Sequence, residues 1–199
     1  DVIMPDGRTL QVASCHHYRD QWAKAFDVKY ESESGEQEFV HQTTYGMSER
    51  LLGAIVATHG DDQGLIMPPS VAPIQVIVIP IMAKNSSDDM VSEAEKIVSK
   101  LKDAGIRARM DARDIRPGQK YYDWEIKGVP LRIEIGPRDL ANDSFMSARR
   151  TGGKESHPLS SLVETVHNEL QTIGEIMSKN SIEHFNSCIS DLPSFSVNG

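Results

Sequence analysis

The feature that most constrains the fold is an almost uninterrupted apolar run over residues 74–81. The run is rich in Ile and Val, which is typical of a strand covered on both faces of a sheet. The next segment repeats apolar residues at helical spacing: Met90, Val91, Ala94, Ile97, Val98 and Leu101. Gly105 marks the end of that helix, and residues 106–110 then alternate as in a strand. The pattern predicts a strand–helix–strand unit with two parallel strands and a right-handed crossover.

Further elements are expected after this unit. A second helix should cover about residues 117–127, because its first residue is a proline, which is well tolerated at a helix start. Residues 131–135 alternate between apolar and charged side chains, so Arg132 and Glu134 should face away from the apolar side of their strand. Another strand is expected over residues 145–150.

The first part of the chain has a different pattern. Residues 38–45 alternate as in a strand, Gly46 interrupts them, and residues 48–58 have the spacing of a helix. Pro68-Pro69 and Pro73 then form a stiff, extended linker, and we place a domain boundary there.

We therefore expect the chain to divide into three parts, at residues 1–69, 70–157 and 158–199. The third part begins with a long amphipathic helix, because apolar residues recur at helical spacing from Pro158 onward.

The charge is unevenly distributed along the chain. The net charge is −8, yet residues 107–154 hold 11 of the 21 Lys and Arg and only seven acidic residues. A basic window of this kind can meet phosphates locally, although a solvated charged face is the simpler interpretation. The two cysteines, Cys15 and Cys188, cannot form a disulfide framework or a cysteine-rich zinc site, and they suit a reducing cytosol. No apolar stretch approaches the length of a membrane span, and no signal peptide is visible.

One candidate for chemistry is the polar cluster over residues 11–17. Cys15, His16 and His17 could ligate a metal, or a cysteine and a histidine could form a nucleophile pair. The third interpretation is the wall of a polar pocket or a histidine in the core. Neighbouring residues on a strand face opposite ways, so His16 and His17 should not line the same site.

Two other segments carry weaker signals. Gly46, Ser48 and Arg50 lie where a strand runs into a helix, and a helix N-terminus with an arginine suits an anion such as phosphate. The alternative is that Arg50 pairs with Glu49. Near residue 121, Tyr121 and Trp124 could stack on unpaired bases, or they could belong to the core.

Several longer motifs occur in a fixed order and together resemble one family. They are Pro5-Asp6-Gly7-Arg8-Thr9-Leu10-Gln11, Ser14-Cys15-His16-His17, Tyr45-Gly46-Met47-Ser48-Glu49-Arg50-Leu51-Leu52-Gly53-Ala54, His59-Gly60-Asp61-Asp62, and Trp124-Glu125-Ile126-Lys127-Gly128-Val129-Pro130-Leu131-Arg132-Ile133-Glu134-Ile135-Gly136-Pro137-Arg138-Asp139-Leu140. This set resembles the prolyl-tRNA synthetases of the archaeal and eukaryotic type, which are class II aminoacyl-tRNA synthetases. The resemblance covers about residues 3–185, and residues 46–57 look like class II motif 3.

The resemblance implies a fold class and a set of functional residues. It implies an α+β catalytic part with an antiparallel sheet, then an α/β anticodon-binding domain with a mixed sheet, and a C-terminal helical segment. By matching motifs, the ATP-binding residues are Gln11, Ser14, Ser48 and Arg50, with Gln11 near the ATP-bound Mg²⁺. The family commonly has Thr at the position of Ser14, which keeps the hydroxyl. His16 matches a proline-binding residue, and the residues that match readers of the anticodon guanines are Glu125, Arg132 and Lys154.

The sequence also departs from the family pattern. Nothing matches class II motif 1 or motif 2, and the cysteines of the family's C-terminal zinc module are absent. We therefore expect a C-terminal part of a proline–tRNA ligase that is inactive by itself and holds no zinc. The expected partners are tRNA(Pro), proline and ATP with Mg²⁺, and the full-length enzyme should be a cytoplasmic homodimer without membrane contact. The alternative is a non-catalytic tRNA-binding accessory protein built from synthetase parts.

Overall fold

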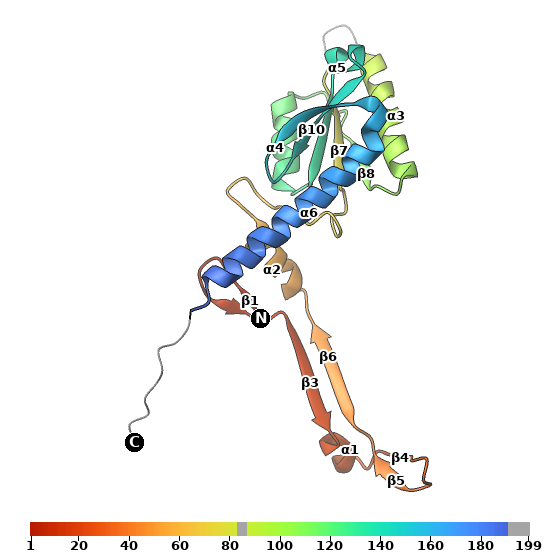
Figure 1. Ribbon diagram of the computed structural model, residues 1–199, viewed down its shortest axis with the longest axis vertical. Coiled ribbons are helices and arrows are strands. Elements are labelled where there is room, and N and C mark those ends of the chain that lie inside the picture. Colours follow the sequence, from red (N-terminus) through yellow and green to blue (C-terminus); the bar gives the residue numbers. More distant parts are fainter. Residues whose placement is uncertain (83–86, 191–199) are drawn as a thin grey trace. The chain divides into compact units, whose positions relative to one another are not determined.

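The computed structural model of the chain describes residues 1–82 and 87–190, except for the side chains of residues 87–89 (Figure 1). Contacts divide the chain into two compact units, residues 1–57 and residues 58–199. In the described ranges, no helix is both long enough and apolar enough to cross a membrane.

The second unit is built on a five-stranded mixed sheet. Its strands are β7 (Val76–Pro80), β8 (Ala108–Met110), β9 (Leu131–Ile135), β10 (Ser144–Arg149) and β11 (Lys154–Pro158). They lie in the order β11-β10-β9-β7-β8, with β7 parallel to both β8 and β9 and β10 antiparallel to its two neighbours. The predicted parallel strand–helix–strand unit is confirmed as β7, α3 (Ser87–Asp103) and β8.

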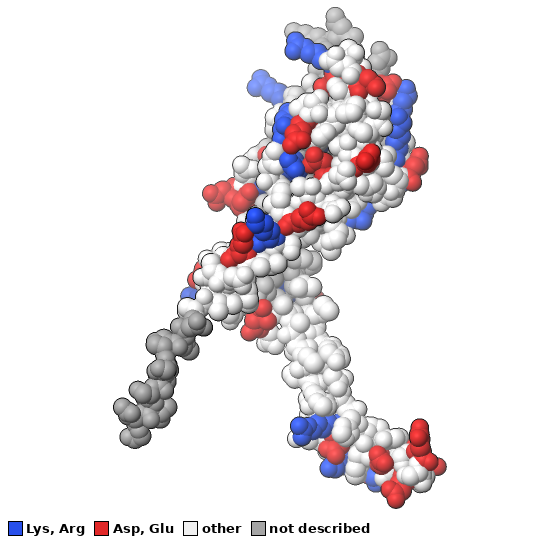
Figure 2. Space-filling view, viewed as in Figure 1, with Lys and Arg blue, Asp and Glu red and all other residues white. Residues whose placement is uncertain are grey.

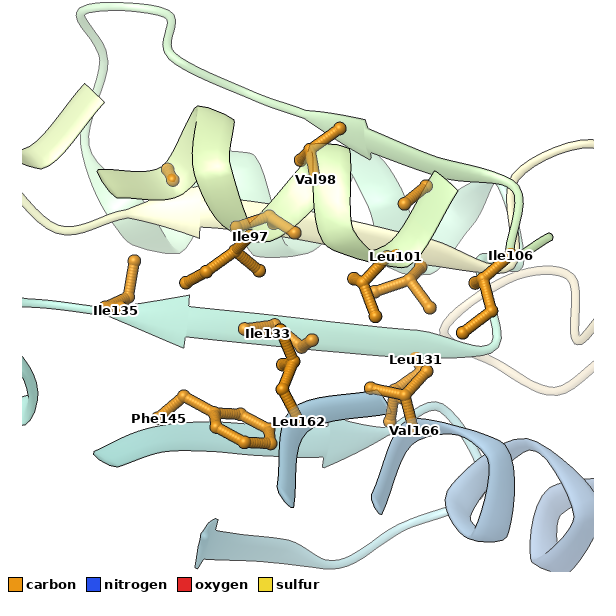
Figure 3. Packing of buried hydrophobic residues seen from close by; sticks show 14 of the residues in the cluster. Ile97, Val98, Leu101, Ile106, Leu131, Ile133, Ile135, Phe145, Leu162 and Val166 are labelled. Atoms are coloured by element: carbon orange, nitrogen blue, oxygen red, sulfur yellow. The ribbon is translucent and has the colours of Figure 1, made fainter. Parts of the chain in front are cut away.

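Helices cover both faces of this sheet (Figure 1). They are α3, α4 (Pro117–Ile126), α5 (Pro137–Ala141), and α6 (Leu162–Ser187), which follows a short 3-10 turn at Leu159–Ser161. On one face, α3 and α6 pack against Val76, Val78 and the apolar side of β9, and Figure 3 shows Leu131 and Ile133 meeting side chains from both helices. On the other face, Trp124 of α4 packs against Ile77 and Ile79. The strand β7 is buried on both sides, as its apolar run predicts.

The long helix α6 buries one stripe of side chains between Leu162 and Met177, and its last ten residues add none. The buried apolar residues of this stripe are Leu162, Val166, Leu170, Ile173 and Met177. Beyond Met177, Ile182 and Phe185 are at least half exposed. The predicted third part runs on to residue 199, and residues 191–199 lie outside the described ranges.

The segment that follows residue 57 packs on the second unit. The Arg150 guanidinium, which is buried, pairs with Asp61 and also donates to the carbonyl oxygen of Gly64 at 3.2 Å. A Cβ on Gly64 would lie 2.6 Å from the Cα of Ile126, so the chain passes here too closely for any side chain. The boundary between the compact units therefore falls after residue 57 in the sequence, whereas we placed a domain boundary at residue 69 from the prolines. Our division into three domains stays a prediction, because compactness alone does not define domains.

The first unit consists of three short antiparallel strand pairs and a helix. They are β1 (Val2–Ile3) with β2 (Thr9–Leu10), β3 (Ala13–Arg19) with β6 (Gln42–Met47), β4 (Lys29–Glu31) with β5 (Gln37–Phe39), and α1 (Gln21–Ala25). The helix α2 (Arg50–His59) begins in this unit. The predicted single strand over residues 38–45 is in fact divided between β5 and β6, because the chain changes its pairing partner from β4 to β3 there. Apart from Arg19 at the end of β3, the two strands of the β3–β6 ribbon contain no Lys, Arg, Asp or Glu, and Figure 2 shows most of the ribbon in white.

Together, the two units have the predicted fold class. Antiparallel strand pairs and the motif 3 helix come first, followed by an α/β unit with a mixed sheet and a C-terminal helix.

Candidate functional site

The β3–β6 ribbon brings the polar residues of the first unit together. Its register places Ser14 opposite Gly46 and His16 opposite Thr44. Because side chains alternate along a strand, Ser14 and His16 share one face of the ribbon, and Cys15 and His17 lie on the other. The expectation that His16 and His17 do not line one site is therefore confirmed by the register.

A hollow of about 300 Å³ lies at the end of this ribbon, where β6 leads into α2. It is lined by Gln11, Val12, Ala13, Ser14, Gly46, Met47, Ser48 and Arg50. The four predicted ATP-binding residues thus come from two separate segments, residues 11–14 and 46–50, and line the same hollow. A Cβ on Gly46 would lie 3.5 Å from the Ser14 hydroxyl oxygen, so a longer side chain at this position would extend toward the hollow.

The hollow has the electrostatic character of an anion site. Arg50 is the first residue of α2, and its backbone N–H donates to the Ser48 hydroxyl at 3.4 Å. Among the residues that the structure describes, Arg50 forms no ion pair, so the alternative pairing with Glu49 is not observed. No carboxylate lines the hollow. A positive side chain and a helix N-terminus therefore face the same space without a counter-charge.

The structure does not bring Cys15, His16 and His17 together on one face of the ribbon. Cys15 is an exposed free thiol on the opposite face of the ribbon from His16. The His16 ring instead stacks on Tyr18, with the ring centroids 5.5 Å apart. In the described part of the chain, the one group of three residues that could hold a metal lies elsewhere, at Glu155, His157 and Glu169. Cys15, His16 and His17 are all exposed, and none of them is among the lining residues of the hollows near this ribbon, so the geometry supports none of the three interpretations. The proline-binding role of His16 stays a prediction.

The second group of predicted residues meets on the face of the sheet that α4 covers. Arg132 of β9 pairs with Glu125 of α4 at 2.9 Å and with Glu134 at 3.0 Å. Lys154 of β11 pairs with the other oxygen of Glu134 at 2.8 Å. Ala148 of β10 is the register partner of both Arg132 and Lys154, so the two cations lie in one row across three strands. The structure thus joins Glu125, Arg132 and Lys154 through a fourth residue.

That fourth residue, Glu134, was not among the predicted site residues. The sequence did contain a signal for it, because a residue two positions after Arg132 on a strand must share its face. Burial acts to raise the pKa of Glu134, but side-chain hydrogen bonds with Lys154 and Tyr121 and the charge of Arg132 outweigh burial and lower it. Glu134 is therefore a buried carboxylate held in its charged form.

The two aromatic residues of α4 have different surroundings. Trp124 is 7% exposed and donates its indole N–H to Asp111 at 2.7 Å, so it belongs to the core, as the alternative interpretation had it. Tyr121 is half-buried, and the Arg132 guanidinium lies 3.9 Å from its ring centroid. Burial and the nearby Glu134 raise the pKa of the Tyr121 hydroxyl, which therefore stays protonated at neutral pH. One face of the Tyr121 ring is covered by Arg132 and is not open to a base.

Comparison with known proteins gives two matching family models in succession. The tRNA synthetase class II core domain (G, H, P, S and T) matches residues 1–59, and the anticodon binding domain matches residues 75–169. The first match contains the hollow, and the second contains the Arg132 cluster.

Similar proteins are found among archaeal proline–tRNA ligases. The protein of Thermococcus kodakarensis is 51% identical over 190 residues, which cover 95% of this chain and 40% of the relative. That of Methanococcoides burtonii is 48% identical over 192 residues, 96% of this chain and 40% of the relative. That of Pyrococcus horikoshii is 53% identical over 150 residues, 75% of this chain and 31% of the relative. The chain thus spans two fifths or less of the length of these relatives.

Proposed function

The chain belongs to the proline–tRNA ligase family, and from this premise we propose that the protein containing it activates proline with ATP and transfers it to tRNA. The observation that carries the proposal is the coincidence of the two family matches with the two polar sites. The match to the class II core contains a polar hollow with an unpaired arginine, and the match to the anticodon-binding domain contains a charged cluster able to read bases.

In the proposed activation step, the first unit binds ATP. Arg50 and the N-terminus of α2 hold phosphate oxygens, and Ser14 and Ser48 donate hydroxyl hydrogen bonds. The hollow suits an anion because its charged lining residue is a cation. Gln11 offers one amide oxygen toward Mg²⁺, and with no carboxylate in the lining, this part of the chain supplies at most a weak metal site. His16, on the same face of the ribbon as Ser14, contacts proline.

None of these residues needs to act as a nucleophile. In activation, the proline carboxylate attacks the α-phosphate of ATP and pyrophosphate leaves, which gives prolyl adenylate. A hydroxyl of the terminal ribose of the tRNA then attacks the activated carbonyl, and AMP leaves. The side chains orient the two substrates and neutralise phosphate charge, which are the contributions that positioning and preorganised donors make to such reactions. This chain alone is expected to be inactive in activation, since it contains no match to motif 1 or motif 2.

In the proposed recognition step, Glu125, Arg132 and Lys154 read the anticodon guanines of tRNA(Pro). A carboxylate accepts from the N–H groups of the guanine Watson–Crick edge, and Arg or Lys donates to O6 or N7. The side chains of Glu125 and Lys154 are 34% and 48% exposed, so both can reach a ligand. We further propose that the full-length protein works in the cytoplasm as a homodimer.

The test is tRNA binding by the 199-residue chain. Two tRNAs are compared, one with the proline anticodon and one with its guanines replaced by adenine, each at two salt concentrations. Arg132→Ala should lower the preference for the proline anticodon by about 5- to 150-fold, corresponding to the loss of a base contact worth about 1–3 kcal/mol. Wild-type binding should weaken with salt for both tRNAs, because phosphate contacts release counterions.

The matched control is Arg138→Ala. Arg138 lies on α5, is exposed, and forms no ion pair within the described ranges. It should leave the preference unchanged. If the wild-type chain binds both tRNAs equally, the recognition role is wrong. If Arg132→Ala weakens both tRNAs by the same factor, Arg132 is a phosphate contact.

A further inference from the structure

Glu134 lies at the centre of the recognition cluster, and its carboxylate is divided between two cations. Oε1 accepts from Arg132 Nε at 3.0 Å, and Oε2 accepts from Lys154 Nζ at 2.8 Å. Its side chain is 8% exposed, whereas those of Arg132 and Lys154 are 16% and 48% exposed. Glu134 is therefore covered by the residues that it holds, and it is too deep to contact a base itself.

The cluster forms a chain of alternating charges: Glu125, Arg132, Glu134 and Lys154. Exposure increases from the centre toward both ends, because Glu125 and Lys154 are the more exposed members. The outer partner of Arg132, Glu125, is the carboxylate that a guanine would engage. Its inner partner, Glu134, is not accessible for exchange.

This arrangement separates two roles within one cluster. When a base takes the Glu125 carboxylate, Arg132 loses one of its two ion pairs. A largely buried guanidinium without any partner would raise the free energy of the complex, because a buried charge would be left unpaired. The guanidinium would then turn toward the nearest acceptor. The second ion pair and the Tyr121 ring, 3.9 Å away, keep the guanidinium in place. Lys154 likewise starts from a fixed position, although its stem is flexible.

We propose that Glu134 is a positioning residue for base reading. It holds Arg132 and Lys154 in an orientation in which their N–H groups can donate to guanine, and it prevents them from turning toward other bases or phosphates. The inference rests on the proposed recognition of the anticodon. It assigns the selectivity of the cluster to a residue that makes no contact with the tRNA.

The experiment compares Glu134→Gln with the wild-type chain, using the two tRNAs described above. The substitution removes a negative charge and releases two cations. Binding of the proline anticodon should weaken about 10-fold, as expected when about one base contact is lost. Binding of the adenine-substituted tRNA should stay the same or tighten, because the surface becomes more positive. A general loss of structure would weaken both tRNAs, so opposite or unequal changes separate positioning from stability.

A second variant covers the case in which Glu134→Gln does not fold. Glu134→Asp keeps the charge but is one methylene shorter, so it cannot reach both cations in their present positions. It should retain the cooperative thermal transition and still lower the preference several-fold. The control is Glu155→Gln, which removes an exposed carboxylate that pairs with Arg149 on the same sheet. It makes the same change in charge, so any effect should be equal for the two tRNAs and the preference should stay unchanged.

The outcomes are distinct. A wild-type preference that survives both Glu134 substitutions would overturn the inference and leave the proposed recognition intact, as would an equal weakening of both tRNAs. A wild-type chain without any preference would overturn the proposed recognition, and the inference with it.

Discussion

At the scale of single residues, the hollow of the first unit depends on Arg50. It is the charged residue in the lining and has no ion-pair partner within the described ranges, so its charge is free for a ligand. In the full-length protein, Arg50→Ala should raise the activation free energy of ATP-dependent proline activation by about 2–4 kcal/mol, which is the usual effect of removing a preorganised donor. The measurement is proline-dependent pyrophosphate exchange. Arg8→Ala serves as the control, since Arg8 is exposed and pairs with Asp6. Unchanged exchange in Arg50→Ala would show that Arg50 does not hold phosphate.

The residues of both sites illustrate what a sequence can and cannot predict. Motif matching selected Gln11, Ser48 and Arg50, and all of them line one hollow. Glu134 was not selected, although strand alternation places it on the same face as Arg132. Its pairing with Lys154 could not be predicted, because Lys154 comes from a strand two places away in the sheet. Contacts across a sheet depend on strand order and register, and the local periodicity of the sequence determines neither.

At the scale of elements, α4 is attached to the sheet by a buried polar group. Asp111 follows β8 and is 4% exposed, and it accepts hydrogen bonds from Trp124 of α4 at 2.7 Å and from Arg113 at 2.9 and 2.7 Å. Burial acts to raise the pKa of Asp111, but these hydrogen bonds outweigh it and lower the pKa from 3.8 to about 2. Because Trp124 is anchored in this way, the next residue of α4, Glu125, is also held close to the sheet, where it pairs with Arg132.

The lowered pKa of Asp111 implies an acid-sensitive contribution to stability. Because the pKa is lower in the folded state, the contribution is complete above about pH 4 and is lost as the pH falls toward 2. Asp111→Asn should therefore lower the free energy of unfolding at pH 7 by about 2 kcal/mol and flatten its decline between pH 4 and pH 2. Urea unfolding at several pH values measures both. The control is Asp114→Asn, at an exposed position nearby, which should change neither the free energy of unfolding at pH 7 nor its decline with pH. An equal loss of free energy in Asp114→Asn would contradict the role of Asp111.

The elements themselves were predictable where the periodicity was strong. The apolar run of β7 and the stripes of α3 and α6 follow from burial, so their spacing was visible. The short helix α5 was not predicted, since five residues hold little periodicity. The strand β11 was missed for another reason: it is an edge strand with mostly exposed side chains, and its residues Lys154–Pro158 show no apolar alternation.

At the scale of the whole molecule, the segment after α2 is fixed to the second unit by Arg150. The Arg150 side chain is 2% exposed. Its guanidinium pairs with Asp61 and donates to the backbone oxygens of Gly64 and Glu125. The bond to Arg150 is the main cause that lowers the pKa of Asp61 to about 2. Glu125 therefore receives a backbone contact from Arg150 on one side and a side-chain contact from Arg132 on the other.

Removing the Asp61 charge should destabilise the second unit. Asp61→Asn leaves a buried guanidinium without its carboxylate, and a buried group that loses its partner costs about 1–3 kcal/mol. The thermal midpoint of the second unit should fall by several degrees, as followed by calorimetry. Asp62→Asn changes the next residue, which is exposed and forms no ion pair in the described part of the chain, and it should leave the midpoint in place. A midpoint in Asp61→Asn equal to that of Asp62→Asn would show that the pair between Asp61 and Arg150 does not stabilise the second unit.

The β3–β6 ribbon, whose one charged residue is Arg19 at the end of β3, has a consequence for the behaviour of the chain in solution. Within the described ranges, neither strand has a partner on its outer edge, and no charged side chain interrupts the stretch over residues 42–48. Natural sheet edges are usually protected against unwanted pairing by lysines, prolines or bulges. Here the protection consists of the bulge between His17 and Arg19 at one end. At the concentrations used for spectroscopy, copies of the isolated chain should therefore associate edge to edge, and a lysine introduced at Thr43 is a direct way to keep them apart.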